Sequence, residues 1–141
     1  MQFAFSTDAS NAYLPHNYEP NYVVYTGTHD NDTTMGWYWK VGKEERQMLQ
    51  QYLGPVGEPM NWALIRLAYQ SVADLAIVPL QDVLGLGSEA RMNTPAKPSG
   101  NWAWRFRMEA LQPEHKTRLR TLALTYGRKE PEVKKAMPSY M

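Results

Sequence analysis

Apolar runs and their spacing divide the first two thirds of the chain into two strand-like segments with a helix between them. Residues 22–26 are β-branched and aromatic, and residues 76–80 are nearly all apolar, so both segments predict buried strands. The order strand, helix, strand, with both strands apolar, is typical of a βαβ unit in a parallel sheet covered on both faces. Residues 61–75 repeat apolar side chains at spacings of three and four, which predicts a helix whose buried face comprises Leu64, Ile65, Leu67, Ala68, Val72 and Leu75.

Three further helices are predicted on either side of this unit. One extends through Trp37, and a second covers residues 44–53. The third has Pro113 and Glu114 in its first turn and stops at Gly127. Its apolar residues recur at helical spacing, so we expect one face to pack against the rest of the chain.

The composition is that of one ordinary globular domain. At 141 residues the chain has the size of a single domain, which we expect over residues 1–127, with a flexible charged tail over residues 128–141. A net charge of +1 provides no basic excess for binding nucleic acid or anionic lipid. No apolar span is long enough to cross a bilayer, and the opening residues lack the features of a secretion signal. With no cysteine, the chain has neither disulfides nor thiolate metal sites.

The residues that follow the first predicted strand carry the chemistry of a binding site. Residues 28–34 concentrate short hydrogen-bonding side chains and place the imidazole of His29 beside the carboxylate of Asp30. Aromatic residues follow at once, among them Trp37. In α/β barrels the chemistry lies at the carboxyl ends of the strands, and polar donors beside aromatic faces suit a sugar. These residues therefore indicate a carbohydrate site.

Other chemistries fit the same motifs less well. A calcium-binding loop would need a glycine near Met35 and a glutamate near Val41, and neither is present, so we expect no metal. Residues 85–90 fit the glycine pattern of a dinucleotide-binding turn, with Glu109 at a suitable distance, but a loop follows instead of a helix and strand. Residues 102–107 mix aromatic and basic side chains, as sites for single-stranded nucleic acid do, yet no basic excess accompanies them.

Two long motifs follow one another along the chain. Residues 25–34 read Tyr-Thr-Gly-Thr-His-Asp-Asn-Asp-Thr-Thr, with Gly36 and Trp37 close behind. The second motif covers residues 81–93 and continues in residues 98–105. Both resemble signature segments of the amylomaltase, or 4-α-glucanotransferase, family, placed within glycoside hydrolase family 77. Shorter matches lie at residues 2–5 and 14–17, so the resemblance covers nearly the whole chain.

The resemblance implies a fold. The family has a (β/α)₈ barrel with inserted subdomains, so this chain would be an α/β segment forming the C-terminal part of a TIM barrel. Residues 3–5, 22–26 and 76–80 would then be strands six, seven and eight. Val24 and Ile77 are expected to face the barrel interior.

The resemblance also implies roles for individual residues. The family transfers α-1,4-glucan segments with retention of configuration, which a double displacement by two carboxylates explains. Those two acids belong to earlier strands and are absent here. Asp30 matches a third acid, a transition-state stabiliser that bonds the 2- and 3-hydroxyls of the sugar at the cleavage point. His29 matches the histidine that supports those contacts, and Asn93 matches an asparagine near the same sugar.

Further candidates for substrate binding are Asp32, Trp37 and Asp8. The family usually places an aspartate of its first loop close to the substrate. Thr7 or Asp8 occupies that region here, and the sequence leaves the choice open. Arg91 is expected to pair with a nearby carboxylate such as Glu89.

The sequence therefore predicts a glucanotransferase segment that is inactive alone and uses no cofactor. Its expected partners are maltooligosaccharides and other α-1,4-glucans, with no nucleic acid and no membrane. It would also join either the missing N-terminal part of the barrel or a second copy through exposed sheet edges. The expected location is the cytoplasm, or the plastid in a plant or alga. A carbohydrate-binding remnant and a nucleotide-binding βαβ unit remain alternatives.

Overall fold

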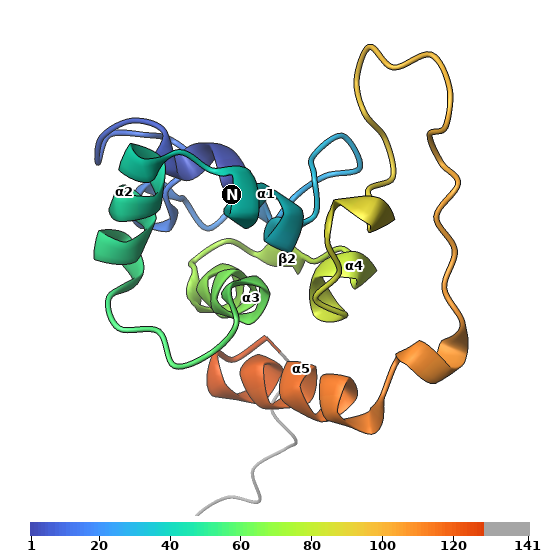
Figure 1. Cartoon of the computed structure of the whole chain (residues 1–141). Helices are drawn as coiled ribbons and strands as arrows, with labels where there is room; N and C mark the ends of the chain where they lie inside the picture. Colours follow the sequence, from blue (N-terminus) through green and yellow to red (C-terminus); the bar gives the residue numbers. More distant parts are fainter. Residues whose placement is uncertain (129–141) are drawn as a thin grey trace, which may run out of the picture.

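The computed structural model describes residues 1–128 and places helix α3 at the centre of an α/β arrangement (Figure 1). The segment between η3 and η4 swings away from the other elements before it returns to α5 (Figure 1). In chain order, with η for 3₁₀ helices, the elements are η1 (Gln2–Phe5), η2 (Pro15–Asn17), β1 (Val23–Tyr25), α1 (Thr34–Lys40), α2 (Lys43–Leu53), α3 (Met60–Gln70), β2 (Leu75–Ile77), α4 (Leu80–Val83), η3 (Ser88–Ala90), η4 (Met108–Ala110) and α5 (Pro113–Thr125).

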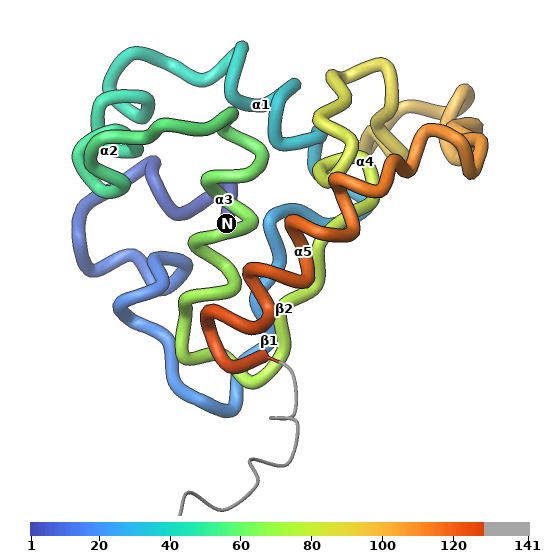
Figure 2. Tube along the Cα trace, turned by 90° about the horizontal axis from the view of Figure 1, so that it is seen from below, coloured from blue at the N-terminus to red at the C-terminus, as the bar shows by residue number. Residues whose placement is uncertain are grey.

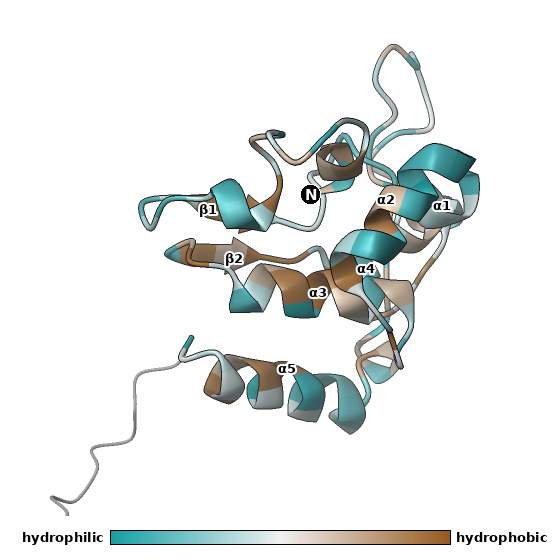
Figure 3. Ribbon diagram, turned by 90° about the vertical axis from the view of Figure 1, so that its left-hand side faces the viewer, coloured by the Kyte–Doolittle hydropathy of each residue, from teal (hydrophilic) through white to brown (hydrophobic). Residues whose placement is uncertain are grey.

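Helix α3 is central because its apolar residues occupy more than one face. Leu64 packs in a cluster that includes Phe5 and residues of α2 and β1. On another side of the helix, Ile65 packs with Val83 of α4 and Leu122 of α5. A helix that is apolar on several sides belongs in a core. Figure 3 shows the apolar colouring of β2 continuing over much of α3, with α5 on the opposite side of that helix.

The two strands pair in parallel, as the βαβ prediction requires. Val23, Val24 and Tyr25 lie opposite Leu75, Ala76 and Ile77, and Figure 2 shows the strands running side by side. One face of this pair packs on the helices, while the other is open. We call the open face, formed by Val23, Tyr25, Leu75 and Ile77, the bare sheet face; these four side chains are 38% to 58% exposed.

The register corrects the expected direction of Val24. Val24 is 2% exposed and packs in the helix-side cluster, so it does not share a face with Ile77. Neighbouring residues of a strand point to opposite faces, and Val24 pairs with Ala76 rather than with Ile77. Ile77 does lie on the bare sheet face, where the interior of a barrel would be.

The central helix is shorter than the periodicity predicts. It ends at Gln70, and Ser71 adopts extended backbone, so Val72 and Leu75 do not belong to its buried face. Both side chains are 58% exposed. The amide N–H of Asp74 donates to the carbonyl of Pro20, just before the strand pairing begins at Leu75. The chain therefore leaves the helix although apolar residues at helical spacing continue as far as Leu75.

Arg128 closes the open end of α3. Its guanidinium donates to the carbonyls of Tyr69 at 2.9 Å, Ser71 at 2.8 Å and Ala68 at 3.1 Å, and also to that of Ala73. Two of these carbonyls belong to the last turn of α3 and two to the residues after it, so the bonds tie the end of α5 to the link before β2. Arg128 therefore belongs to the folded part, whereas the rest of the expected tail, residues 129–141, lies outside the described residues.

Residues 3–5 form part of a 3₁₀ helix rather than the expected strand. Only the backbone nitrogen of Met1 reaches β1, where it donates to the carbonyl of Tyr25 at 2.7 Å. Ala4 and Phe5 are 0% and 1% exposed, whereas Phe3 is 60% exposed, so two residues of this run pack in the core and none pairs as a strand. The α/β class is confirmed, while the numbering of β1 and β2 as the seventh and eighth barrel strands stays a prediction.

Candidate active site

A cavity of about 580 Å³ opens where β1 and β2 end. Its walls are the loop of residues 27–33, the residues 77–79 at and just after the end of β2, and the pair Arg91 and Met92 from a loop further along the chain. Parallel strands bring their carboxyl ends to the same edge of a sheet, which is why loops distant in sequence meet here. The structure thus places the sequence-predicted His29 and Asp30 at one cavity with residues that follow β2.

Asp30 presents a half-exposed carboxylate at this cavity. Its side chain is 51% exposed, and Oδ1 accepts a hydrogen bond from Asn93 Nδ2 at 2.6 Å. The imidazole Nε2 of His29 lies 3.4 Å from the same oxygen. The Asp30 oxygen Oδ2 has no protein partner among the described residues, so the carboxylate is oriented by one oxygen and can accept hydrogen bonds at the other.

The loop of Asp30 and the loop of Asn93 are bonded through their backbones as well. The amide N–H of Asn93 donates to the carbonyl of His29 at 3.1 Å. The guanidinium of Arg91 donates to the carbonyl of Asp30 at 2.7 Å and to that of Asn93 at 2.8 Å. The expected pairing of Arg91 with Glu89 is absent, because Glu89 instead accepts from the amide N–H of Gly87 at 2.9 Å.

Trp102 brings an aromatic face to His29. The two ring centroids lie 5.2 Å apart, and the indole remains 53% exposed. Its backbone has φ of 60°, a left-handed conformation that is costly for a bulky residue, and its amide N–H donates to the carbonyl of Met92 at 2.7 Å. The ring therefore lies beside the imidazole on a residue whose backbone conformation is strained.

A buried carboxylate fixes the first turn after β1. Asp82 is 1% exposed and accepts hydrogen bonds from Thr26 Oγ1 at 2.6 Å, Thr34 Oγ1 at 2.8 Å and the Thr34 amide N–H at 2.7 Å. Burial raises the pKa of Asp82, and these hydrogen bonds oppose that rise only in part. The three bonds join the end of β1, the start of α1 and helix α4, and so define the ends of the loop that carries Asp30.

Asp32 is directed into the protein and not toward Asp30. Its side chain is 9% exposed, and Oδ2 accepts from Lys40 Nζ at 2.8 Å and Ser88 Oγ at 2.7 Å, while Oδ1 accepts from the Thr33 amide N–H at 2.9 Å. Burial raises the pKa of Asp32, but the bonds from Lys40, Ser88 and Thr33 outweigh it, so the pKa is lower than usual. Asp32 also lines both hollows that Asp30 borders, and its role in substrate binding stays a prediction.

Trp37 lines a hollow together with Asp30, whereas Asp8 does not. Trp37 is half-buried against Phe5, with ring centroids 6.2 Å apart, and borders a second hollow of about 540 Å³ that Asp30 and Arg91 also line. Asp8 lines neither hollow; its carboxylate accepts from the amide N–H and hydroxyl of Ser10 on its own exposed loop. The structure therefore brings Trp37, but not Asp8, to the neighbourhood of Asp30.

Gly36 allows α1 to approach the Asp32 cluster. A Cβ at this position would lie 2.4 Å from Ser88 Oγ and 2.6 Å from Asp32 Oδ1. We therefore expect Gly36→Ala to force the helix away and to lower the free energy of unfolding by about 1–3 kcal/mol. Urea-unfolding midpoints at one fixed protein concentration measure this. The control is Gly57→Ala, where a Cβ would meet nothing within 4 Å; equal midpoints for the two variants would contradict the expectation.

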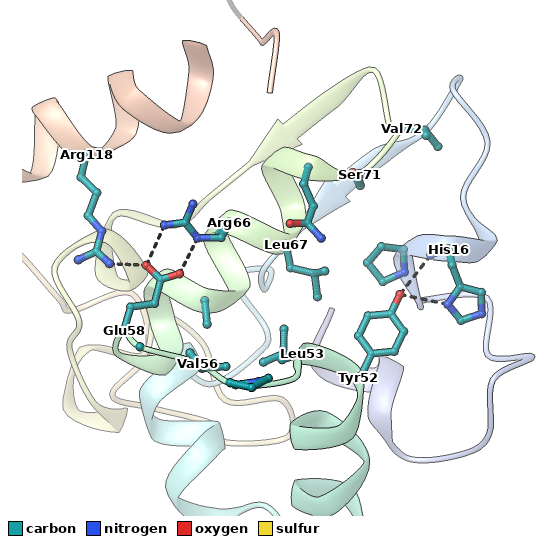
Figure 4. A pocket seen from close by; sticks show the side chains of 15 residues that line it. His16, Tyr52, Leu53, Val56, Glu58, Arg66, Leu67, Ser71, Val72 and Arg118 are labelled. Atoms are coloured by element: carbon teal, nitrogen blue, oxygen red, sulfur yellow. Dashed lines mark hydrogen bonds and ion pairs between the residues drawn. The ribbon is translucent and has the colours of Figure 1, made fainter. Parts of the chain in front are cut away.

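A hollow of about 890 Å³, larger than the two at Asp30, lies elsewhere (Figure 4). At one end Glu58 accepts from Arg66 at 2.6 Å and from Arg118, and at the other Tyr52 bonds His16. None of the sequence-predicted site residues lines it. The charged side chains Glu58, Arg66 and Arg118 are bonded to one another, so the Glu58 carboxylate is not free to act as an acid or base.

Sequence reasoning did not single out Asp82, Arg91 or Trp102 as parts of this site. Each lies inside the second motif, which was the available signal.

The dinucleotide interpretation of residues 85–90 gains no support, because residues 91–107 form a loop and not the helix and strand it requires. Within residues 1–128, no three His, Asp or Glu side chains gather as a metal site would need, and none of the helices has the length and apolarity to span a membrane.

Comparisons with known proteins agree on the class of protein that this fold and site define. A family model described as 4-alpha-glucanotransferase, glycoside hydrolase family 77, matches residues 1–111. The chain therefore belongs to the 4-alpha-glucanotransferase family.

Individual relatives show the extent of the similarity. The chain is 53% identical over 131 residues to the 4-alpha-glucanotransferase of Thermus thermophilus, covering 87% of this chain and 26% of that one. It is 50% identical over 133 residues to the chloroplastic/amyloplastic enzyme of Arabidopsis thaliana, covering 91% of this chain and 23% of the relative. An amylomaltase from Streptococcus agalactiae in complex with acarbose superimposes with a TM-score of 0.85 at 33% identity, covering 89% and 26% of the two chains. The chain thus spans about a quarter of the length of these relatives.

Proposed function

We propose that this segment works within a 4-α-glucanotransferase and contributes Asp30 to its active site. The observation that carries the proposal is the half-exposed carboxylate of Asp30, held at one oxygen by Asn93 at 2.6 Å and open at the cavity where β1 and β2 end. A carboxylate in this state can accept hydrogen bonds from sugar hydroxyls without losing its orientation.

The proposed role of Asp30 is to stabilise the transition state. In a retaining transfer, one carboxylate attacks the anomeric carbon, and a second first protonates the leaving oxygen and then deprotonates the acceptor hydroxyl. The sugar ring flattens and gains positive charge as the bond breaks. A carboxylate that bonds the 2- and 3-hydroxyls then stabilises the ring more strongly in the transition state than in the ground state.

Neighbouring residues support this role in different ways. His29 and Asn93 fix the carboxylate, since both approach its Oδ1. Trp37 contributes an aromatic surface to the adjoining hollow. Asp32 contributes indirectly by anchoring α1 through Lys40. The place of Asp8 in the reaction stays a prediction, because Asp8 lines neither hollow at Asp30 and its Oδ1 accepts both bonds from Ser10.

The substrate class follows from the site and from the family. Polar side chains that can bond hydroxyls lie beside aromatic rings here, and the similar amylomaltase has been solved with acarbose. We infer that the substrates are α-1,4-glucans, including maltooligosaccharides. The names of the Arabidopsis and Solanum tuberosum relatives place those proteins in plastids; the location of this chain stays a prediction.

Activity is expected only in the full-length enzyme that carries this segment. That enzyme should convert maltotriose into both shorter and longer oligomers, as mass spectrometry of the products would show. The purified segment should show no conversion above a heat-denatured blank, because the attacking carboxylate and the acid/base are supplied by other parts of the enzyme. Turnover by the purified segment would refute the division of catalytic groups proposed here.

A further inference from the structure

Arg91 closes a ring of hydrogen bonds around the proposed catalytic pair. One end of its guanidinium donates to the carbonyl of Asp30 at 2.7 Å, and its Nε donates to the carbonyl of Asn93 at 2.8 Å. The side chains of those two residues are bonded to each other at 2.6 Å. A single planar group therefore fixes the backbones of the two residues whose side chains must meet.

No salt bridge accounts for the position of Arg91. The arginine salt bridges among the described residues join Arg66 and Arg118 to Glu58, far along the chain from this loop. Arg91 is partly buried and lines both hollows that Asp30 borders. The hydrogen-bond partners of its guanidinium are the backbone carbonyls of Asp30 and Asn93.

We propose that Arg91 is the positioning residue of the Asp30–Asn93 pair, a role that rests on the proposed glucanotransferase function. Asp30 and Asn93 lie on separate loops, which are joined by their side-chain bond and by the backbone bond from Asn93 to His29. Arg91 adds a bond to the carbonyl of Asp30 itself and one to the carbonyl of Asn93, and so fixes the backbone of one residue relative to the other. A guanidinium has fixed donors in one plane and binds two carbonyls with little loss of rotamer entropy, whereas a lysine ammonium on a flexible stem does not reproduce the span.

The expected effect is on the chemical step. A displacement of about 1 Å at a catalytic group can lower the rate by about a hundredfold. In the full-length enzyme, Arg91→Ala should therefore lower kcat for maltotriose disproportionation by about tenfold to a hundredfold, with KM changed less than about threefold. Arg91→Lys should recover only part of the rate, and added guanidinium salt should restore part of the activity of Arg91→Ala.

The matched control is Arg46→Ala. Arg46 also donates to a backbone carbonyl, that of Tyr38 at 2.7 Å, but it lines neither hollow at Asp30. Its removal should leave kcat within about twofold of the parent enzyme. An equal fall in kcat for the Arg46 and Arg91 variants would show a general effect of losing an arginine and would overturn the proposal.

A double-mutant cycle separates positioning from general stability. If Arg91 acts through Asp30, Arg91→Ala should lower kcat only slightly further in an enzyme that already carries Asp30→Asn. A purely structural arginine would give additive losses, and additivity overturns the proposal. Should Arg91→Ala fail to fold, Arg91→Lys enters the same cycle.

The same cycle distinguishes a failure of the proposed function of the site from a failure of the positioning role of Arg91. If Asp30→Asn alone leaves kcat unchanged, the proposed function of the site is wrong, and the role of Arg91 is wrong with it. If Asp30→Asn abolishes activity while folded Arg91 variants keep kcat within about twofold, only the positioning role is wrong.

Discussion

In the full-length enzyme, Asp30→Asn is expected to lower kcat roughly a thousandfold, which corresponds to ~4 kcal/mol of lost transition-state stabilisation. Asparagine has nearly the same shape, and its oxygen can still accept the 2.6 Å bond from Asn93. The substitution therefore removes the charge without removing the scaffold. Because the lost stabilisation belongs mainly to the flattened, positively charged ring, KM should change much less than kcat.

Initial rates of maltotriose disproportionation over a range of substrate concentrations test this expectation. Asp74→Asn is the control, since Asp74 is an exposed carboxylate that lines none of the hollows. Its kcat should match that of the parent enzyme. A fall in kcat of less than about tenfold for Asp30→Asn would show that Asp30 does not carry the proposed role.

The second large effect concerns the isolated segment, which we expect to associate at micromolar concentration. The bare sheet face presents four apolar side chains that are 38% to 58% exposed, and within residues 1–128 each strand pairs with only one neighbour. Unpaired strand edges beside an apolar surface favour pairing with another copy. Sedimentation velocity should therefore detect dimers or larger species, and hydrogen exchange should slow at the strand amides as concentration rises.

A matched pair of variants tests the surface responsible. Leu75 and Val72 are both 58% exposed, but only Leu75 lies on the bare sheet face. Leu75→Lys should shift the segment toward monomer, whereas Val72→Lys should not. A compact monomer at low micromolar concentration, with well protected strand amides, would show that the segment is a domain in its own right.

The longer helices and the order strand, helix, strand could be predicted from sequence because their signals are local, but the strand expected over residues 76–80 ends at Ile77, and Leu80 begins α4. Residues 44–53 and Pro113 carry helical spacing and a helix start, and the structure has helices at Lys43–Leu53 and Pro113–Thr125. The end of α3 could not be predicted in this way. It depends on the backbone bond from Asp74 to Pro20 and on the bonds that Arg128 donates to carbonyls such as that of Ser71. These contacts join residues more than fifty positions apart.

The motif around Asp30 identified the loop that carries the site but not the direction of each side chain. Asp30 and Asp32 differ by two positions and both appear as polar residues of one motif. The first is half exposed, and the second is bonded to Lys40 and Ser88. This difference depends on Ser88, a residue of a distant loop, so no local pattern could contain it.

Successive residues of β1 differ in whether their contacts lie within this segment. Val24 packs in the cluster around α3, so its contacts are complete within the segment, whereas Val23 and Tyr25 remain 43% and 38% exposed. A substitution at Val24 should alter the isolated segment and the complete enzyme alike. At Val23 or Tyr25 the cost should be larger in the complete enzyme, if other strands cover the sheet there. Tolerance measured on the segment alone would therefore overstate the freedom of every second residue in its strands.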